Sequence, residues 1–389
     1  MKKFLALGLA LIMALSCCAC SSNGGGKNAD GYKVAMITDY GDITDQSFNQ
    51  TTYEACKAFC EANKIDFTYY KPAGDSTADR VAMVDTAVAD GYNVIVMPGF
   101  AFAGTIVQAA PNYKDVKFIA LDVSEGDILA EAVGASYDYN PDNWKLSDYL
   151  DMSNVYCAVY QEELSGFMAG YAAVSLGYTE LGFLGGMAVP AVIRYGFGFV
   201  QGADAAAAAK GANVNIKYAY GNQFFGDADI TAAMDTWYSG GTQVVFACGG
   251  GIYSSAAEAA AKVNGKVIGV DVDQKAIIDG QYGEGMTVTS AMKGLAATVN
   301  SALTDVVLNG KWSDYSGKIV TLGLVSGSDA SLNYCQLPVE GTQFADGFTK
   351  DDYAKLVADM FNGVIKVSND ISAMPATTNV TVDDQGNIK

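Results

Sequence analysis

The sequence predicts an α/β protein made of two doubly wound units, each with a parallel sheet covered by helices. Short runs rich in β-branched residues alternate with helical patterns from Tyr32 onward, which is the rhythm of successive βαβ units. The rhythm breaks at residues 123–154, which are acidic and loop-like, and a second series of similar plan then begins. With 389 residues, half of them apolar, the chain is long enough to bury two full cores.

The first series opens with a strand over "KVAMIT" and a helix from about Ser47 to Asn63, in which Ser47 and Gln50 have the spacing of a capping box. It continues with "IDFTYY" as a strand, "ADRVAMVDTAVADG" as a helix, "NVIVMPG" as a strand, residues 103–113 as a helix and "VKFIALD" as a strand. This order is typical of a parallel sheet with helices on both faces.

The run "SNVYCAVYQ" leads into the second series, which starts with a helix over "QEELSGFMAGYAAVSLG", a strand over "ELGFLGG" and a helix through "VIRYGFGFVQGADAAAAAK". The segments "VNIKYAY", "ITAAMDTWYSG", "TQVVFACGG", "SSAAEAAAKV" and "KVIGVDVD" then alternate between strand and helix. A long helix over "SAMKGLAATVNSALTDVVLNG", the run "KIVTLGLV" and a late helix over "DDYAKLVADMFNG" follow. Because doubly wound sheets bind ligands outside the carboxyl ends of their strands, two facing units predict a site between them.

The N-terminus, "MKKFLALGLALIMALSCCAC", has the composition of a secretory signal, with two lysines, an apolar core and small residues. The polar stretch "SSNGGGKNADG" that follows reads as a flexible tether. A cysteine between a signal core and such a tether resembles a bacterial lipobox, and Cys20 is favoured for lipidation because the small Ala19 precedes it. Cys17 and Cys18 are alternatives for the anchor, and an ordinary cleaved signal is the alternative to a lipid.

The charge and the missing histidine exclude whole classes of function. The formal net charge is −19, and it becomes −21 without residues 1–19, whose charges are Lys2 and Lys3 alone. Such a surface repels phosphate backbones, so nucleic acid is not an expected partner. The chain has no histidine, which rules out Ser-His-Asp and Cys-His catalysis and His-ligated zinc.

The cysteines beyond Cys20 predict buried thiols and no disulfide framework, because their number is odd and their contexts are apolar. They are Cys56, Cys60, Cys157, Cys248 and Cys335.

Polar, aromatic and glycine residues follow the predicted strands of both units. The first unit has Asp39, Tyr40, Asp45, Ser47, Phe48, Asn49, Gly99, Phe100 and Asp122, and the second has Gly185, Gly186, Gly249, Gly250, Gly251, Asp271, Asp273, Gln274 and Lys293. The set combines carboxylates, an amide, an ammonium and rings. It holds no activated nucleophile, and its glycine runs match no phosphate-binding motif. We therefore expect a site for a polar, partly aromatic molecule, with no catalytic residue, cofactor or resident metal.

The stretches "DYGDITDQSFNQ", "GFLGGMAVPAVIRYGFGFVQG" and "VIGVDVDQ", with a following "SAMKG", resemble the basic membrane protein family over residues 33–309. This family consists of lipid-anchored substrate-binding proteins of ABC importers, of the purine-nucleoside-receptor type. The resemblance implies the type I periplasmic-binding-protein fold, in which two lobes joined by three crossovers close on a nucleoside. It also implies that the chain is not an enzyme.

The resemblance implies which residues of this chain would contact the purine base of the ligand. Asp39 and Asp122 would accept hydrogen bonds from the purine edge, and Phe48 would stack on one face of the base. Asn49 would add both kinds of hydrogen-bonding group at the base edge.

For the second ring, Tyr195 stands where the family usually has phenylalanine, and Phe197 is the alternative. Asp271 and Lys293 match the positions that hold the ribose hydroxyls. The remaining expected contacts are Tyr40, Gly99 and Gly249.

The predicted organisation interleaves two lobes along the chain. The segments are a signal peptide at 1–19, a lipid-anchored tether at 20–31, an N-terminal lobe at 32–157 and 293–320, a C-terminal lobe at 158–292 and 321–375, and a tail at 376–389. We expect a monomer on the extracellular face of the cell membrane, held there by its N-terminal lipid. It would pass purine nucleosides to ABC permease subunits.

Two other functions stay open from the sequence alone. A sugar receptor of the same fold would use Asp271 and Lys293, and a surface nucleoside hydrolase would need water-activating chemistry. Structural roles also stay open, with Asp39, Asp45 and Ser47 as caps of the first helix. The sequence does not choose among guanosine, adenosine and inosine.

Overall fold

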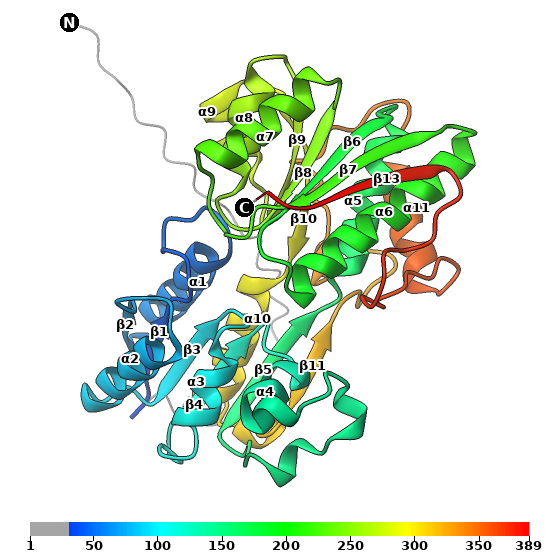
Figure 1. The fold of residues 1–389 in the computed structure, drawn as a ribbon. Helices are drawn as coiled ribbons and strands as arrows, with labels where there is room; N and C mark the ends of the chain where they lie inside the picture. Colours follow the sequence, from blue (N-terminus) through cyan, green and yellow to red (C-terminus); the bar gives the residue numbers. More distant parts are fainter. Residues whose placement is uncertain (1–30, 389) are drawn as a thin grey trace, which may run out of the picture.

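The computed structural model describes residues 31–388 and contains two mostly parallel sheets, each covered by helices (Figure 1). The signal peptide, residues 20–30 of the tether and Cys20 lie outside the described residues. The first sheet has six parallel strands in the order β11-β5-β4-β3-β1-β2. The second has seven in the order β12-β10-β9-β8-β6-β7-β13, and β12 alone among them runs antiparallel to its neighbour.

We call the unit around the first sheet the first lobe and the unit around the second sheet the second lobe. The elements of the first lobe are β1 (Lys33–Ile37), α1 (Phe48–Asn63), β2 (Asp66–Tyr70), α2 (Thr77–Ala89), β3 (Val94–Pro98), α3 (Phe102–Ala109), β4 (Lys117–Leu121), α4 (Glu125–Val133), β5 (Val155–Tyr160), α10 (Leu295–Leu303) and β11 (Ile319–Leu322). The elements of the second lobe are α5 (Glu162–Ser175), β6 (Glu180–Gly185), α6 (Pro190–Lys210), β7 (Val214–Tyr220), α7 (Ala228–Ser239), β8 (Val244–Cys248), α8 (Tyr253–Ala261), β9 (Lys266–Asp271), α9 (Lys275–Tyr282), β10 (Thr287–Lys293), β12 (Cys335–Gln336), α11 (Lys350–Phe361) and β13 (Val380–Asn387).

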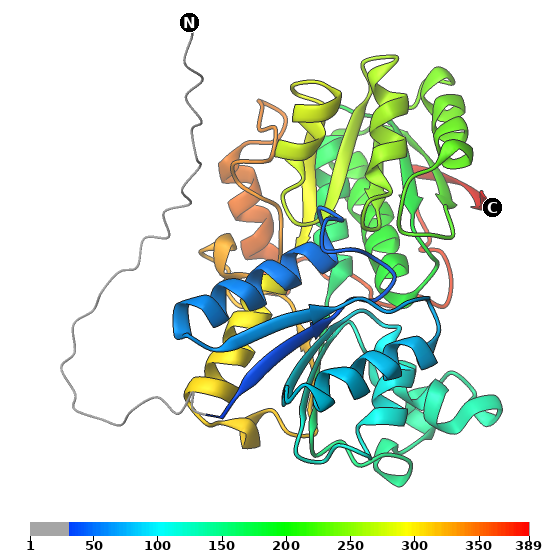
Figure 2. The ribbon, with the colours of Figure 1, turned by 90° about the vertical axis from the view of Figure 1, so that its left-hand side faces the viewer.

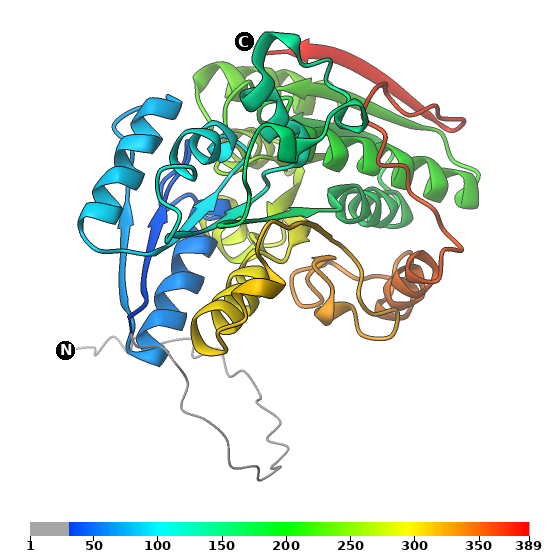
Figure 3. The ribbon, with the colours of Figure 1, turned by 90° about the horizontal axis from the view of Figure 1, so that it is seen from below.

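Each sheet is buried on both faces because successive strand residues point to opposite sides. In the first lobe, Ala35, Ile95 and Phe118 pack under α2, α3 and α4, and Val34 and Ile119 pack under α1 and α10. Figure 3 shows α1 and α10 side by side, although more than two hundred positions separate them in the chain. The five cysteines predicted to be core thiols are buried and free.

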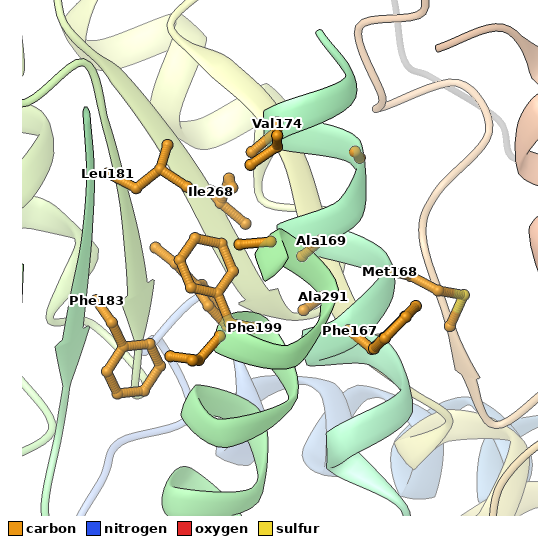
Figure 4. Packing of buried hydrophobic residues seen from close by; sticks show 14 of the residues in the cluster. Phe167, Met168, Ala169, Val174, Leu181, Phe183, Phe199, Ile268 and Ala291 are labelled. Carbon is orange, nitrogen blue, oxygen red and sulfur yellow. The ribbon is translucent and has the colours of Figure 1, made fainter. Parts of the chain in front are cut away.

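The second lobe has a core on each face of its sheet, one under α7 and α8 and one under the helix pair α5 and α6, which Figure 4 shows. Phe183 and Ile268 of the sheet face Phe199 of α6 and Ala169 of α5 there. The two helices approach so closely that a Cβ added at Gly170 would lie 2.1 Å from the Phe199 carbonyl oxygen. Only glycine permits this backbone contact.

The chain passes between the lobes three times, as the predicted fold requires. The passages join β5 to α5, β10 to α10, and β11 to β12. The structure shifts each predicted lobe boundary by one to three residues. In the first sheet, β5 continues past the predicted boundary at 157 to Tyr160, and β11 continues past 320 to Leu322. Lys293, which was predicted to begin the second segment of the N-terminal lobe, is the last residue of β10 in the second sheet. Within residues 31–388, no helix combines the length and the apolar character needed to cross a bilayer.

Two predictions about irregular segments need correction. Residues 123–154 contain the helix α4, whose start is fixed by a capping box between Ser124 and Asp127, so the segment that was predicted to be loop-like begins with a helix. The tail predicted at 376–389 contains β13, which pairs in parallel with β7 at the edge of the second sheet. Its polar sequence gave no sign of a strand, because an edge strand needs few buried side chains.

We predict that Gly170→Ala lowers the free energy of unfolding by about 1–3 kcal/mol, because the backbone of α6 must shift to admit the methyl group. The matched control is Gly280→Ala in α9, where no atom lies within 4 Å of the added Cβ and where alanine should stabilise the helix by about 0.5–1 kcal/mol. Denaturant unfolding of both variants measures the difference. Equal effects at the two positions would contradict the packing role of Gly170.

Candidate ligand-binding site

A cavity lies between the lobes, at the carboxyl ends of the parallel strands of both sheets. Its empty space is about 850 Å³, its open mouth included. The lining residues come from both lobes: Asp39, Gly41, Asp45, Phe48, Asn49, Gly99, Phe100, Asp122, Ser124, Asp127, Val159, Val189, Pro190, Ala191, Val192, Arg194, Tyr195, Phe224, Cys248, Gly249, Gly250, Val270, Asp271 and Lys293. Of the residues predicted to contact the ligand, Tyr40 and Phe197 are missing from this lining; the strand-end residues that are missing as well are Ser47, Gly185, Gly186, Gly251, Asp273 and Gln274.

Asp39, Asn49 and Asp45 form a hydrogen-bonded group at the first-lobe wall. The Asn49 amide nitrogen donates to Asp39 Oδ1 at 2.9 Å and to Asp45 Oδ2 at 3.0 Å, so both of its N–H groups are used. Asp39 Oδ1 also accepts from the Gly41 N–H at 3.0 Å. Asn49 is therefore a support for two carboxylates, and the prediction that it offers donors to a base edge needs correction.

Gly99 makes room for Asp39. It adopts φ +122°, and a Cβ added there would lie 2.3 Å from Asp39 Oδ2. Gly99 thus follows β3 in a conformation and a space that a larger residue cannot share with the carboxylate.

Asp45, and not Ser47, caps the first helix. Asp45 Oδ1 accepts from the backbone N–H groups of Ser47 and Gln50, at 2.9 and 3.1 Å, and Oδ2 accepts from that of Asn49 at 2.9 Å. The Ser47 hydroxyl instead donates to Asp271 Oδ2 in the second lobe, at 2.6 Å. Figure 2 shows the loop ahead of α1 beside the second lobe. The predicted Ser47 capping box is wrong because the Asp45 carboxylate, a stronger and charged acceptor, takes the Gln50 N–H that the Ser47 hydroxyl would accept.

The ammonium of Lys293 is the centre of an ion-pair network. Its Nζ lies 2.6 Å from Asp122 Oδ2 in the first lobe and 3.3 Å from Glu162 Oε1 at the start of α5. It lies 3.8 Å from Asp271 Oδ1 in the second lobe. Glu162 also accepts from Arg194 Nε at 2.6 Å. The Lys293 side chain is 3% exposed and is therefore buried.

The two aspartates at strand ends have matching backbones. Asp122 follows β4 with φ +60°, and Asp271 ends β9 with φ +66°. Non-glycine residues pay for this left-handed conformation, and such strain collects at functional sites. The same left-handed φ in both lobes places the Asp122 carboxylate of the first lobe and the Asp271 carboxylate of the second lobe near Lys293.

Burial and charge shift the titration of these groups in opposite directions. Burial raises the pKa of Asp39 to about 6, against the hydrogen bonds from Gly41 and Asn49. Burial also raises the pKa of Asp122 and of Asp271, although Lys293 opposes both shifts. Burial disfavours the ammonium of Lys293, but the surrounding carboxylates outweigh it and raise its pKa.

The rings of the site are distributed differently from the prediction. Phe48 lines the cavity, and Lys293 Nζ lies 5.1 Å from its ring centroid. Phe197 is packed in the core of the second lobe, 6.4 Å from Tyr218, because its place on α6 faces the sheet. Tyr40 lies behind the lining and packs on Phe100 and Phe224, at 5.9 and 6.4 Å between centroids.

Phe224 is a ring that the sequence analysis missed. It follows β7 in the second lobe, is half-buried and lines the cavity. Two glycines of the second lobe make room for this ring, because an added Cβ would lie 2.5 Å from it at Gly186 and 3.0 Å from it at Gly249. The strand end "YAYGNQFFG" was the available signal.

Arg194, Glu162 and Asp127 were also missed as parts of the site. Arg194 lines the cavity and pairs with Glu162. No pattern in the sequence brings Glu162 to Lys293, since 131 positions separate them. Within residues 31–388, no group of three acids or cysteines has the arrangement of a metal site.

A sequence model of the Bmp family, described as ABC transporter substrate-binding protein PnrA-like, matches residues 32–328. The chain is 27% identical to the ABC transporter nucleoside-binding protein BmpA of Lactococcus lactis subsp. cremoris, over 93% of this chain and 97% of that protein. It is 25% identical to an uncharacterized lipoprotein of Pyrococcus furiosus, over 86% of this chain and 79% of that protein.

Among solved structures, an ABC transporter solute-binding protein from Conexibacter woesei matches with a TM-score of 0.62 at 20% identity, over 87% of this chain and 99% of that one. One from Aeropyrum pernix matches with a TM-score of 0.61 at 22% identity, over 86% and 87% of the two chains. These likenesses confirm the predicted α/β periplasmic-binding-protein fold. By the match over residues 32–328, the chain belongs to the Bmp family of ABC transporter substrate-binding proteins.

Proposed function

We propose that this protein captures purine nucleosides in the cavity between its lobes and delivers them to an ABC permease. The observation that carries the proposal is one cavity in which ring surfaces, Phe48 and Phe224, adjoin acceptor carboxylates, Asp39 and Asp122. A base offers a flat surface and N–H donors, which match these two kinds of wall. The name of the Lactococcus relative, a nucleoside-binding protein, supports the same ligand class.

The charges of the cavity favour a neutral ligand over a nucleotide. Lys293 and Arg194 line it, but Lys293 is paired with Asp122 and both cations are paired with Glu162. A phosphate needs free cations or open helix N-termini. The start of α4 is capped by Ser124 and Asp127, and the start of α6 in the lining has no side-chain cap, so it is the paired cations that favour a neutral ligand. A nucleoside needs neither.

Asp122 Oδ1 is the clearest acceptor for the ligand. Asp122 Oδ2 accepts from Lys293, whereas Oδ1 is buried and has no partner among residues 31–388. Buried polar atoms without a partner are rare and costly, so a ligand donor at this place would gain a strong hydrogen bond. We assign Asp39 and Asp122 to the base edge and Asp271 and Lys293 to the ribose.

For the second stacking ring we propose Phe224 in place of Tyr195. Lys293 Nζ lies 5.4 Å from the centroid of the Tyr195 ring, and the Phe246 ring lies perpendicular to it with 5.9 Å between the centroids. Tyr195 is 1% exposed, so its ring has little free surface. Phe224 is half-buried in the lining and belongs to the lobe opposite Phe48. A base held by both rings would therefore join the lobes.

Lobe closure is the proposed mechanism of capture. Hydrogen bonds already cross between the lobes, from Lys293 to Asp122, from Ser47 to Asp271, and from the Gln274 amide to the Gln46 carbonyl oxygen at 3.1 Å. A ligand that touches both walls would favour this closed state over an open one. We propose that a permease recognises the closed form of a monomer anchored to the outer face of the membrane through Cys20.

The experiment that tests the function is calorimetric titration of the chain from Gly31, unfolded and refolded to remove carried ligand. The panel is adenosine, guanosine, inosine, cytidine, ribose, galactose and adenine, with chromatography of the products. We expect one-to-one binding of a purine nucleoside that stays intact. Binding of sugars alone would replace the proposal by a sugar receptor, and release of free base would reveal a hydrolase.

We predict that Phe48→Ala and Phe224→Ala each weaken purine-nucleoside binding by about 1–3 kcal/mol, the scale of base–aromatic stacking. The same titration measures both variants. Phe361→Ala, at a half-exposed position of α11 away from the cavity, is the control and should bind like the wild type. An unchanged affinity in Phe224→Ala would remove that ring from the site.

We predict opposite pH dependences for ligand affinity and for the stability of the free protein. Protonation of Asp39, with its pKa of about 6, removes an acceptor, so affinity should fall as the pH is lowered from about 8 to 5. In the same range the folded state binds more protons than the unfolded state, because burial also raises the pKa of Glu163 to about 7. The free energy of unfolding of the free protein should therefore rise as the pH falls.

Calorimetry and denaturant unfolding at matched pH values check the two trends. An affinity that increases toward pH 5 would contradict the role of Asp39, since the ligand would then present acceptors to a protonated carboxyl group.

A further inference from the structure

A second unpaired polar atom belongs to the cavity lining and has no role so far. Tyr195 is 1% exposed, and its hydroxyl has no hydrogen-bond partner among residues 31–388. Of the lining residues, only Asp122 and Tyr195 have such an atom in that part of the chain. A buried hydroxyl without a partner destabilises the folded protein, so its presence calls for a ligand that pairs with it.

The surroundings of Tyr195 point to the sugar end of the cavity. Tyr195 lies near the start of α6, with Lys293 Nζ 5.4 Å from its ring centroid. After burial, the charge of Asp271 is the strongest influence that raises the pKa of Tyr195. The ring of Tyr195 therefore lies beside Lys293, whose ammonium is 3.8 Å from Asp271 Oδ1.

Asp271 keeps hydrogen-bonding capacity beside Tyr195. Its Oδ2 accepts from the Ser47 hydroxyl at 2.6 Å. Its Oδ1 lies 3.8 Å from Lys293 Nζ, which is too far for a direct hydrogen bond. A ligand hydroxyl can donate to one group and accept from another at the same time, so it suits a place between a carboxylate and a phenol.

We propose that Tyr195 is a specificity-determining residue whose hydroxyl binds the same ribose hydroxyl as Asp271. The inference rests on the proposed function, because it assigns the sugar end of that same cavity. A nucleoside without this hydroxyl leaves both buried groups unpaired, and such sites reject the incomplete analogue strongly. The ligand class is thus narrowed to nucleosides with an intact ribose diol.

A neighbouring tyrosine of the same lobe supplies a matched control. Tyr218 in β7 is as buried as Tyr195, but its hydroxyl lies 3.0 Å from the Tyr220 hydroxyl and it does not line the cavity. Replacing either tyrosine by phenylalanine removes one oxygen atom and leaves the ring in place. The two variants therefore separate the loss of a ligand contact from the loss of a buried hydroxyl.

The test is calorimetric titration of Tyr195→Phe and Tyr218→Phe with the best-bound purine nucleoside and with its 2′-deoxy and 3′-deoxy analogues. Tyr195→Phe should lower the affinity for the ribonucleoside roughly tenfold. It should bind the analogue that lacks the shared hydroxyl as well as the wild type does, because the contact is absent in both cases. Tyr218→Phe should leave all affinities unchanged.

Thermal unfolding of the ligand-free variants provides a second, independent test, because it measures their stability. Tyr195→Phe should be at least as stable as the wild type, since it removes an unpaired hydroxyl, whereas Tyr218→Phe should be less stable. Equal affinities of wild type and Tyr195→Phe for the ribonucleoside, or equal losses for all three ligands, would overturn this inference and leave the proposed function intact. A wild-type protein that binds no nucleoside would overturn both.

Discussion

The ammonium of Lys293 is the interaction on which the rest of the site depends. It is almost fully buried, and it bonds Asp122 of the first lobe while Asp271 of the second lies within ion-pair distance. It also pairs with Glu162 at the passage from β5 to α5, and Lys293 itself ends β10 at the next passage. Removing one partner of such a buried network leaves an uncompensated charge, which strongly lowers the free energy of unfolding. The same ion pairs therefore constrain the positions of the lobes, of the passages between them and of the cavity walls.

This constraint explains why an acidic cavity can suit a neutral molecule. The cations at its wall are occupied by carboxylates, and the carboxylates that are left are held by amide and backbone donors, as Asn49 and Gly41 hold Asp39. The site therefore offers acceptors in fixed positions without a free positive charge. Those features favour N–H and O–H donors on a ligand and disfavour phosphate.

Backbone geometry sets the shape of the cavity as much as side chains do. Asp122 and Asp271 adopt the same left-handed turn at equivalent strand ends, and Gly99 and Gly249 leave space for a carboxylate and a ring. Each lobe thus places a carboxylate at a left-handed position after a buried strand, where the backbone sets the direction in which it enters the cavity. Such preorganisation lowers the ordering cost of binding.

The sequence by itself determined the alternation of strands and helices and the acids at the strand ends, because hydrophobic periodicity and short-range spacing are local properties. It therefore indicated Asp39, Asp122 and Asp271 as lining residues. Only the tertiary structure decided contacts between distant segments: Ser47 bonds the opposite lobe, Glu162 reaches Lys293, and residues 380–387 complete a sheet edge. These outcomes depend on how two lobes face each other, which no local pattern encodes.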